Sequence, residues 1–245
     1  MAIDLRPKTA TMEGVGVRTD VDAGLRKYML SVYNYMAMGV AFTGVVTLVM
    51  ANMPDLMYSV AVGPIKWVLF APLLGMGFMS TKIITMKSMA AAQGFFWVYC
   101  ALWGVMISPM IYAFLGTPGG ILDIARAFFI TAGMFAGMSI VGYTTKKDLS
   151  GFGRFAVMAV IGIIIAGLVN AFFVGSSEFA FIMSLVTVLL FAGITAWETQ
   201  MIKNMYFQAP AEMVTKLAIF GALGLYGSFV VMFIHILNLI GIMRD

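Results

Sequence analysis

The chain has 245 residues, of which 62% are hydrophobic and 11% are charged, and its formal net charge is +4. Soluble domains are about 45–50% apolar and about 25% charged, so this composition excludes an ordinary soluble protein and predicts an integral membrane protein. Because a membrane-spanning helix needs about 20 apolar residues, the chain has room for about seven spans in one membrane domain.

Residues 1–27 are polar and carry charges of both signs, so we expect a polar N-terminal tail there and a membrane domain over residues 28–245. No short apolar region with a small-residue cleavage site follows a basic start, which predicts that the chain has no cleaved signal peptide. Asp20 or Asp22 is placed to cap a short helix over residues 25–30 that leads into the first span.

Apolar stretches of spanning length then follow one another along the chain. We place seven spans, at about 32–51, 67–86, 91–115, 125–143, 155–174, 179–200 and 217–242. Turn-forming residues separate them, most clearly at 52–55 after the first span and at 116–120 between the third and fourth. The sequence therefore predicts an all-α, polytopic membrane protein.

The distribution of Lys and Arg among the connections predicts how the spans are oriented, because these residues near span ends mark the cytoplasmic side. The N-terminal tail and every second connection are rich in them: Arg26, Lys27, Lys82, Lys87, Lys146, Lys147, Arg154, Lys203 and Lys216. The other connections hold little positive charge, with Lys66 in one and Arg126 beside Asp123 in another. We therefore expect the N-terminus in the cytoplasm and the C-terminus outside.

Glu198 closes the sixth predicted span and is the first candidate for function, because an ionisable group at or inside a membrane boundary is costly to keep there. It is either a carboxylate that extends to the headgroups, or a buried one that exchanges a proton near neutral pH or holds a cation. Lys87 and Lys82 come from another cytoplasmic connection and are possible partners for it. Lys203 is the local alternative.

The seventh predicted span carries one polar stripe, because Ser228, His235 and Asn238 recur at helical spacing. His235, the only histidine, is either a pH sensor or a neutral imidazole that hydrogen-bonds a neighbouring helix. In the fifth span, Asn170 is expected to form a hydrogen bond between helices.

Gly133 and Gly137 in the fourth predicted span form a small-xxx-small face, which allows another helix to approach closely. We expect this face to pack against a helix of the same chain. A dimer interface is the alternative.

The residues do not point to an enzyme. Ser228 and His235 cannot be a nucleophile and its base, because two helical turns place them about 10 Å apart. No cluster of ligand residues has metal-binding spacing, and no basic patch alternates with aromatic residues. We therefore expect no catalytic residue, no resident cofactor and no nucleic-acid partner.

Several stretches have the residues and order of known family signatures: 28–35, 142–150, 167–172, 222–226, 238–239 and Trp197-Glu198-Thr199-Gln200-Met201-Ile202-Lys203. Together they resemble the Bax inhibitor family of membrane proteins over most of the chain. The resemblance implies a seven-helix bundle with its seventh helix near the centre. It also implies a pH-dependent leak of Ca²⁺, which would be the transported ion, across a bacterial inner membrane or the membrane of an organelle derived from one.

In conducting members of the family, two aspartates on the sixth and seventh helices are thought to share a proton and close the cytoplasmic side of the path. The resemblance places the first at Glu198 and the second at Ser228, where this chain has no carboxylate. Two carboxylates about 3 Å apart cannot both ionise at low cost. A glutamate facing a serine lacks that mutual repulsion.

The resemblance also carries an alternative, because some bacterial relatives are associated with a membrane AAA protease and quality control. The serine at 228 favours such a modulator, and a structural subunit of a larger membrane complex is a third possibility. We expect a pH-modulated cation leak gated at Glu198 and Ser228. The alternative is an interaction protein that does not conduct ions.

Overall fold

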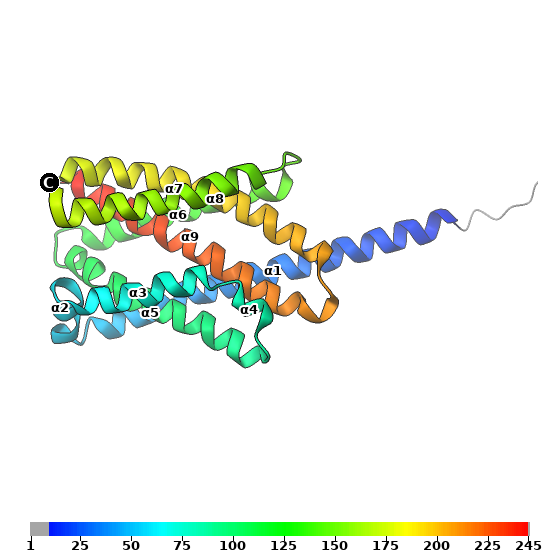
Figure 1. Cartoon of the computed structure of the whole chain (residues 1–245), viewed down its shortest axis with the longest axis horizontal. Coiled ribbons are helices and arrows are strands. Elements are labelled where there is room, and N and C mark those ends of the chain that lie inside the picture. The colour runs from blue at the N-terminus through cyan, green and yellow to red at the C-terminus, as the bar shows by residue number, and fades with distance from the viewer. Residues whose placement is uncertain (1–9, 245) are drawn as a thin grey trace, which may run out of the picture.

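The computed structural model describes the backbone of residues 10–244 and the side chains of residues 23–210 and 212–244. Every regular element in these ranges is helical (Figure 1). In chain order they are α1 (Ala10–Met50), α2 (Pro54–Val62), α3 (Ile65–Phe78), α4 (Lys82–Thr85), α5 (Met89–Leu115), α6 (Gly120–Thr144), α7 (Ser150–Val169), the π-helical turn η1 (Asn170–Val174), α8 (Ser177–Gln208), the 3₁₀ turn η2 (Ala211–Met213) and α9 (Val214–Ile242).

Six of these segments are long and apolar enough to cross a membrane: Ala23–Met50 of α1, α5, α6, α7 together with η1, α8 and α9. The helices α2 and α3 pass the same test only as a pair, and they meet at a bend of 75°. The described chain is therefore an all-helical membrane protein with six spans, or seven if the bent pair counts as one. Predicted spans other than the second coincide with these segments.

The second predicted span was wrong as a single helix over 67–86. The chain instead forms α2 in the stretch assigned to a connection, bends at Gly63 and Pro64, and ends α3 at Phe78. Proline disfavours helical backbone at the residue before it, which accounts for the break ahead of α3. The glycines at 75 and 77 weaken the last turn of α3, and Lys82 then begins the separate short helix α4.

The cap predicted at Asp20 or Asp22 was also wrong. The first helix starts at Ala10, runs without a break to Met50, and so includes both positions. Between Pro7 and Pro54 no proline interrupts this stretch, and a proline inside a helix is what most strongly breaks it. The part of the predicted tail at residues 1–9 lies outside the described residues.

Helix α9 is the most buried of the candidate spans. In its most apolar window 78% of the residues are buried, against none in α7 with η1. It packs against α1, α4, α5, α6 and α8, whereas α7 packs mainly against α8. The largest apolar cluster includes residues of α9 from Leu217 to Met232. The side chains of α9 are therefore the ones best shielded from lipid.

Glycines set two of the closest approaches between helices. A side chain at Gly142 of α6 would overlap the backbone carbonyl of Ala196 on α8, and one at Gly153 of α7 would overlap the ring of Trp197. Because backbone cannot move aside as a flexible side chain can, the contact at Gly142 is the stricter of the two.

We predict that Gly142→Ala separates α6 from α8 and lowers the stability of the protein by about 1–3 kcal/mol, the usual cost of overpacking a closely packed site. The measurement is the thermal unfolding midpoint of the purified protein in detergent. The matched control is Gly133→Ala in the same helix, where an added methyl group meets no atom within 4 Å. Equal midpoints for the two variants would contradict this account of the α6–α8 contact.

Candidate functional site

The structure brings Glu198 of α8 and Ser228 of α9 into direct contact. The Ser228 hydroxyl donates a hydrogen bond of 2.7 Å to Oε2 of Glu198. Ser228 is buried and Glu198 is partly buried. One turn before Ser228, Gly224 leaves room for the carboxyl group, because a Cβ there would lie 3.0 Å from Oε1. The pair is thus a polar link between two apolar helices.

The lysines considered as partners of Glu198 lie elsewhere. Lys82 and Lys87 are exposed and form no ion pair with Glu198 in the described part of the chain. Lys203 donates a hydrogen bond of 2.8 Å to the backbone carbonyl of Tyr143, and its ammonium lies 4.8 Å from the centre of the Tyr143 ring. Pairing of Glu198 with Lys203 was therefore wrong, because five residues along a helix point to a different side.

A second polar contact joins the same two helices. Nδ1 of His235 lies 3.1 Å from the Ser184 hydroxyl of α8, and the Asn238 amide donates a hydrogen bond of 2.9 Å to the same oxygen. One arrangement satisfies all three groups: Asn238 donates to Ser184, and Ser184 donates to the imidazole. The hydrogen bond expected of His235 toward a neighbouring helix is present. Ser184, which is buried, was not predicted from the sequence as a partner of these residues.

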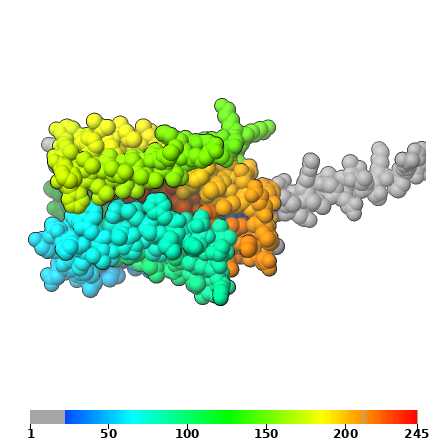
Figure 2. Space-filling model, viewed as in Figure 1, coloured from blue at the N-terminus to red at the C-terminus, as the bar shows by residue number. Residues whose placement is uncertain are grey.

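The residues of α9 that remain partly exposed fall mainly on one stripe, which includes Gly224, Gly227, Val231, His235 and Asn238. These positions recur every three or four residues and so share one face of the helix. The space-filling view shows α9 at the floor of a hollow between the layer of α2, α3 and α4 and the layer of α7 (Figure 2). Part of α9 is thus open to the surroundings.

A third polar contact was also missed from the sequence. The buried Tyr226 hydroxyl of α9 lies 2.6 Å from that of Thr43 on α1, and Thr43 also donates to the Cys100 carbonyl of α5 at 3.1 Å. The Thr47 hydroxyl, one turn further along α1, lies 2.9 Å from the Thr43 carbonyl and 3.2 Å from the Gly104 carbonyl of α5, so it is shared between these two acceptors. These bonds join α1, α5 and α9 within the apolar core.

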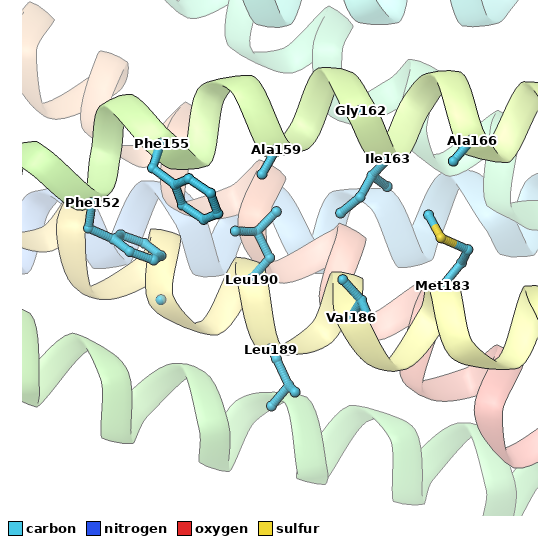
Figure 3. A pocket seen from close by; sticks show the side chains of 11 residues that line it. Phe152, Phe155, Ala159, Gly162, Ile163, Ala166, Met183, Val186, Leu189 and Leu190 are labelled. Atoms are coloured by element: carbon cyan, nitrogen blue, oxygen red, sulfur yellow. The ribbon is translucent and has the colours of Figure 1, made fainter.

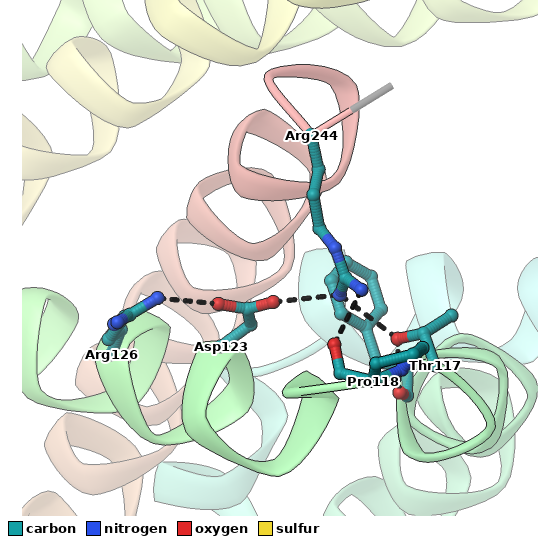
Figure 4. A network of polar contacts seen from close by, with 6 residues as sticks. Thr117, Pro118, Asp123, Arg126 and Arg244 are labelled. Carbon is teal, nitrogen blue, oxygen red and sulfur yellow. Dashed lines mark hydrogen bonds and ion pairs between the residues drawn. The ribbon is translucent and has the colours of Figure 1, made fainter.

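At the C-terminal end of α9, a charged network holds the helix to its neighbours (Figure 4). Arg244 donates to Asp123 at 2.9 Å and to Pro118 and Thr117 in the α5–α6 turn. Asp123 also pairs with Arg126 at 3.0 Å, and its side chain is 8% exposed. The sequence predicted Thr117 and Pro118 as part of a turn and placed Arg126 beside Asp123, but it did not predict the contacts of Arg244.

The remaining candidates have simpler positions. Asn170 bonds to the backbone of Ser176, through its oxygen at 3.1 Å and its nitrogen at 3.3 Å, so it closes the turn before α8 and does not reach a side chain on another span. Gly133 and Gly137 are exposed, with open space where a Cβ would lie. Their expected packing inside the chain was wrong, because Phe135 and Ser139 occupy the inward face of α6.

No group of three or more His, Cys, Asp or Glu side chains that could hold a metal ion occurs among the described residues. Glu198 has a hydroxyl as its hydrogen-bond partner, and His235 has a hydroxyl as well. These groups can exchange protons or transiently contact a cation. The expectation of no resident cofactor stays a prediction.

The model of the protein family described as "Inhibitor of apoptosis-promoting Bax1" matches residues 25–245 of this chain. The chain belongs to the Bax inhibitor family. A relative from Rickettsia prowazekii, described as an uncharacterized protein, is 38% identical and aligns over 97% of this chain and 98% of its own length.

Another Bax inhibitor family relative is the inner membrane protein YbhL of Escherichia coli, 35% identical over 89% of this chain and 93% of its own length. A relative from Caulobacter vibrioides is also 35% identical, with 92% of each chain covered. The name of YbhL gives a location and no activity. Membership in the family and a membrane setting therefore follow from these similarities.

We predict that Arg244→Gln lowers the free energy of unfolding by about 1.5–3 kcal/mol, the range for a hydrogen bond to a charged group. The variant leaves the shielded Asp123 carboxylate with one cation in place of two. Arg126→Gln is the matched control, since it removes the same charge from the same carboxylate at a side chain that is 59% exposed, where ion pairs contribute about 0–1 kcal/mol. Thermal unfolding in detergent measures both. A larger loss in Arg126→Gln would show that Arg244 is not the main partner.

Proposed function

We propose that this protein is a pH-modulated leak pathway for cations, with Ca²⁺ as the transported ion and Glu198 as the gating group. The hydrogen bond between Ser228 and Glu198 carries the proposal. It is a contact between two spans at a carboxyl group that is partly buried. The proposed activity needs no catalytic residue and no resident cofactor.

The chemistry of the pair gives the gate its response to protons. A hydrogen bond from a hydroxyl to an ionised carboxylate is roughly twice as strong as a hydrogen bond between neutral groups. Uptake of a proton by Glu198 removes that charge and weakens the bond that holds α8 to α9. We therefore expect the contact to loosen, and the leak to increase, as the pH falls. One carboxyl group is sufficient for this, so Ser228 does not need to be an aspartate.

The proposal includes a topology. The bent pair α2 and α3 would form a broken second span, giving seven, and α9 would lie at the centre of the bundle. The N-terminus would be cytoplasmic, as would the end of α8 that carries Glu198. The cations Lys146 and Lys147 of the α6–α7 loop and Arg154 near the start of α7 support this orientation.

A second candidate function rests on the outer face of α6. Gly133 and Gly137 are exposed and leave open space, so another helix could approach the backbone closely there. This favours a protein that binds a membrane AAA protease or another membrane complex and conducts no ions.

The decisive measurement is Ca²⁺ flux into proteoliposomes at pH 6, 7 and 8. We predict that the wild-type flux is largest at pH 6, and that Glu198→Gln gives a flux that no longer varies with pH, because its neutral amide resembles the protonated carboxyl group. Glu178→Gln is the matched control, since Glu178 is an exposed carboxylate at the start of the same helix. Absence of flux above that of empty liposomes at every pH would rule out the leak.

For the second candidate, we predict that Gly133→Ile/Gly137→Ile loses a partner that co-purifies with the wild type after gentle solubilisation, because bulky side chains prevent close helix approach. The measurement is the stoichiometry of the isolated complex. Gly167→Ile, at an exposed glycine of α7 with equal free space, should retain the partner. Retention by the double variant would exclude this face as the interface.

A further inference from the structure

An apolar groove of about 620 Å³ runs along the outer side of α7 and α8 (Figure 3). Phe152, Phe155, Ala159 and Gly162 of α7 line it, with Val186 and Leu190 of α8 among those opposite. The two helices touch closely at one end, where a side chain at Gly193 would overlap the ring of Phe152. Beyond that contact, small residues of α7 such as Ala159 and Gly162 leave space between the two helices.

The shape of this groove suits an alkyl chain. From Phe152 to Ala166, both of which line it, α7 extends about 21 Å at about 1.5 Å per residue, more than the half-thickness of about 15 Å of a bilayer core. A groove of about 620 Å³ that follows this length is elongated and lined by apolar side chains. These properties suit a single hydrocarbon chain.

A polar pocket lies past the closed end of the groove. It has a volume of about 280 Å³ and is lined by Ser150, Gln200, Asn204 and Gln208, together with Trp197. The ring of Trp197 rests against Gly153 of α7, between the two hollows. Tryptophan is common at the level of lipid headgroups because its ring is apolar and its N–H is polar. The polar pocket and the apolar groove therefore follow one another along the two helices in the same order as the headgroup and the acyl chain of a phospholipid.

The charge beside the polar pocket is positive. Lys146, Lys147 and Arg154 are exposed and have no ion-pair partner within hydrogen-bonding reach among the described side chains. Asp148 is the acidic residue of the α6–α7 loop, and its carboxylate accepts a hydrogen bond of 2.9 Å from the Ser150 N–H. Hydrogen bonds from Ser150 hold the pKa of Asp148 below its usual value. Even with this carboxylate ionised, the loop keeps a net positive charge.

We propose that this protein binds one anionic phospholipid at the α7–α8 surface. One acyl chain lies in the apolar groove, and the phosphate lies at the polar pocket beside Lys146 and Lys147 of the α6–α7 loop and Arg154 of α7. Basic pockets between membrane helices bind anionic headgroups in this way. An unfilled groove would leave its apolar lining without contacts, which lipid restores.

The test measures which lipid stays bound to the full-length protein. The purified chain is placed in nanodiscs with equal amounts of phosphatidylglycerol and phosphatidylcholine, extracted with mild detergent, and examined by native mass spectrometry. The wild type should retain one phosphatidylglycerol in preference to phosphatidylcholine. Lys147→Gln/Arg154→Gln should reduce that preference by about tenfold or more. Lys82→Gln/Lys87→Gln, which removes two exposed cations from another connection, should keep it.

A second pair of variants tests the groove itself. Gly162→Leu adds a side chain where a Cβ meets no atom within 4 Å, so the protein should fold, with an unchanged unfolding midpoint, and lose the bound lipid. Gly167→Leu lies on the same helix, has equal space and does not line the groove, and should retain the lipid. Equal retention of the two lipids by the wild type would overturn the proposal. So would lipid retention in Gly162→Leu, or a second copy of the chain in place of lipid.

Discussion

The structure depends on one constraint: within a bilayer, a polar side chain finds its partner in the protein or has none, because hydrocarbon supplies no hydrogen bonds. Helix α9 meets this constraint on several sides. It pairs Ser228 with Glu198, Tyr226 with Thr43, and both His235 and Asn238 with Ser184. The same helix supplies much of the apolar core. Its polar residues thus specify which neighbours it packs against.

The membrane class, the helical architecture and most span positions followed from the sequence, because a long uncharged apolar run leaves few structural choices. The region around Gly63 and Pro64 did not, since mean hydropathy is the same for one straight helix and for two bent pieces. Which side of a helix faces the rest of the protein was equally hard to predict. Gly133 and Gly137 have the spacing of a packing face, yet they lie on the outside of α6.

The candidate site was partly predictable. Glu198 and Ser228 were paired by resemblance to family signatures, and they do meet. Ser184, Thr43 and Thr47 were missed because serine and threonine in a span often bond to the carbonyl one turn earlier, as Thr187 and Thr195 do here. Their sequence context does not show which of them also contact another helix. The groove between α7 and α8 was not predicted either. It depends on how two helices pack against each other, and the apolar pattern of one helix does not encode that packing.

The burial of α9 has a consequence for biogenesis. Among the described helices it is the last in chain order, and it carries the partners of polar groups on α1 and α8. Until α9 enters the membrane, Ser184 and Glu198 of α8 lack the side-chain partners that α9 provides. Assembly of this bundle is thus completed from its C-terminal side, and a nascent chain that stalls before α9 would present unpaired polar groups to the translocon, to chaperones and to membrane proteases.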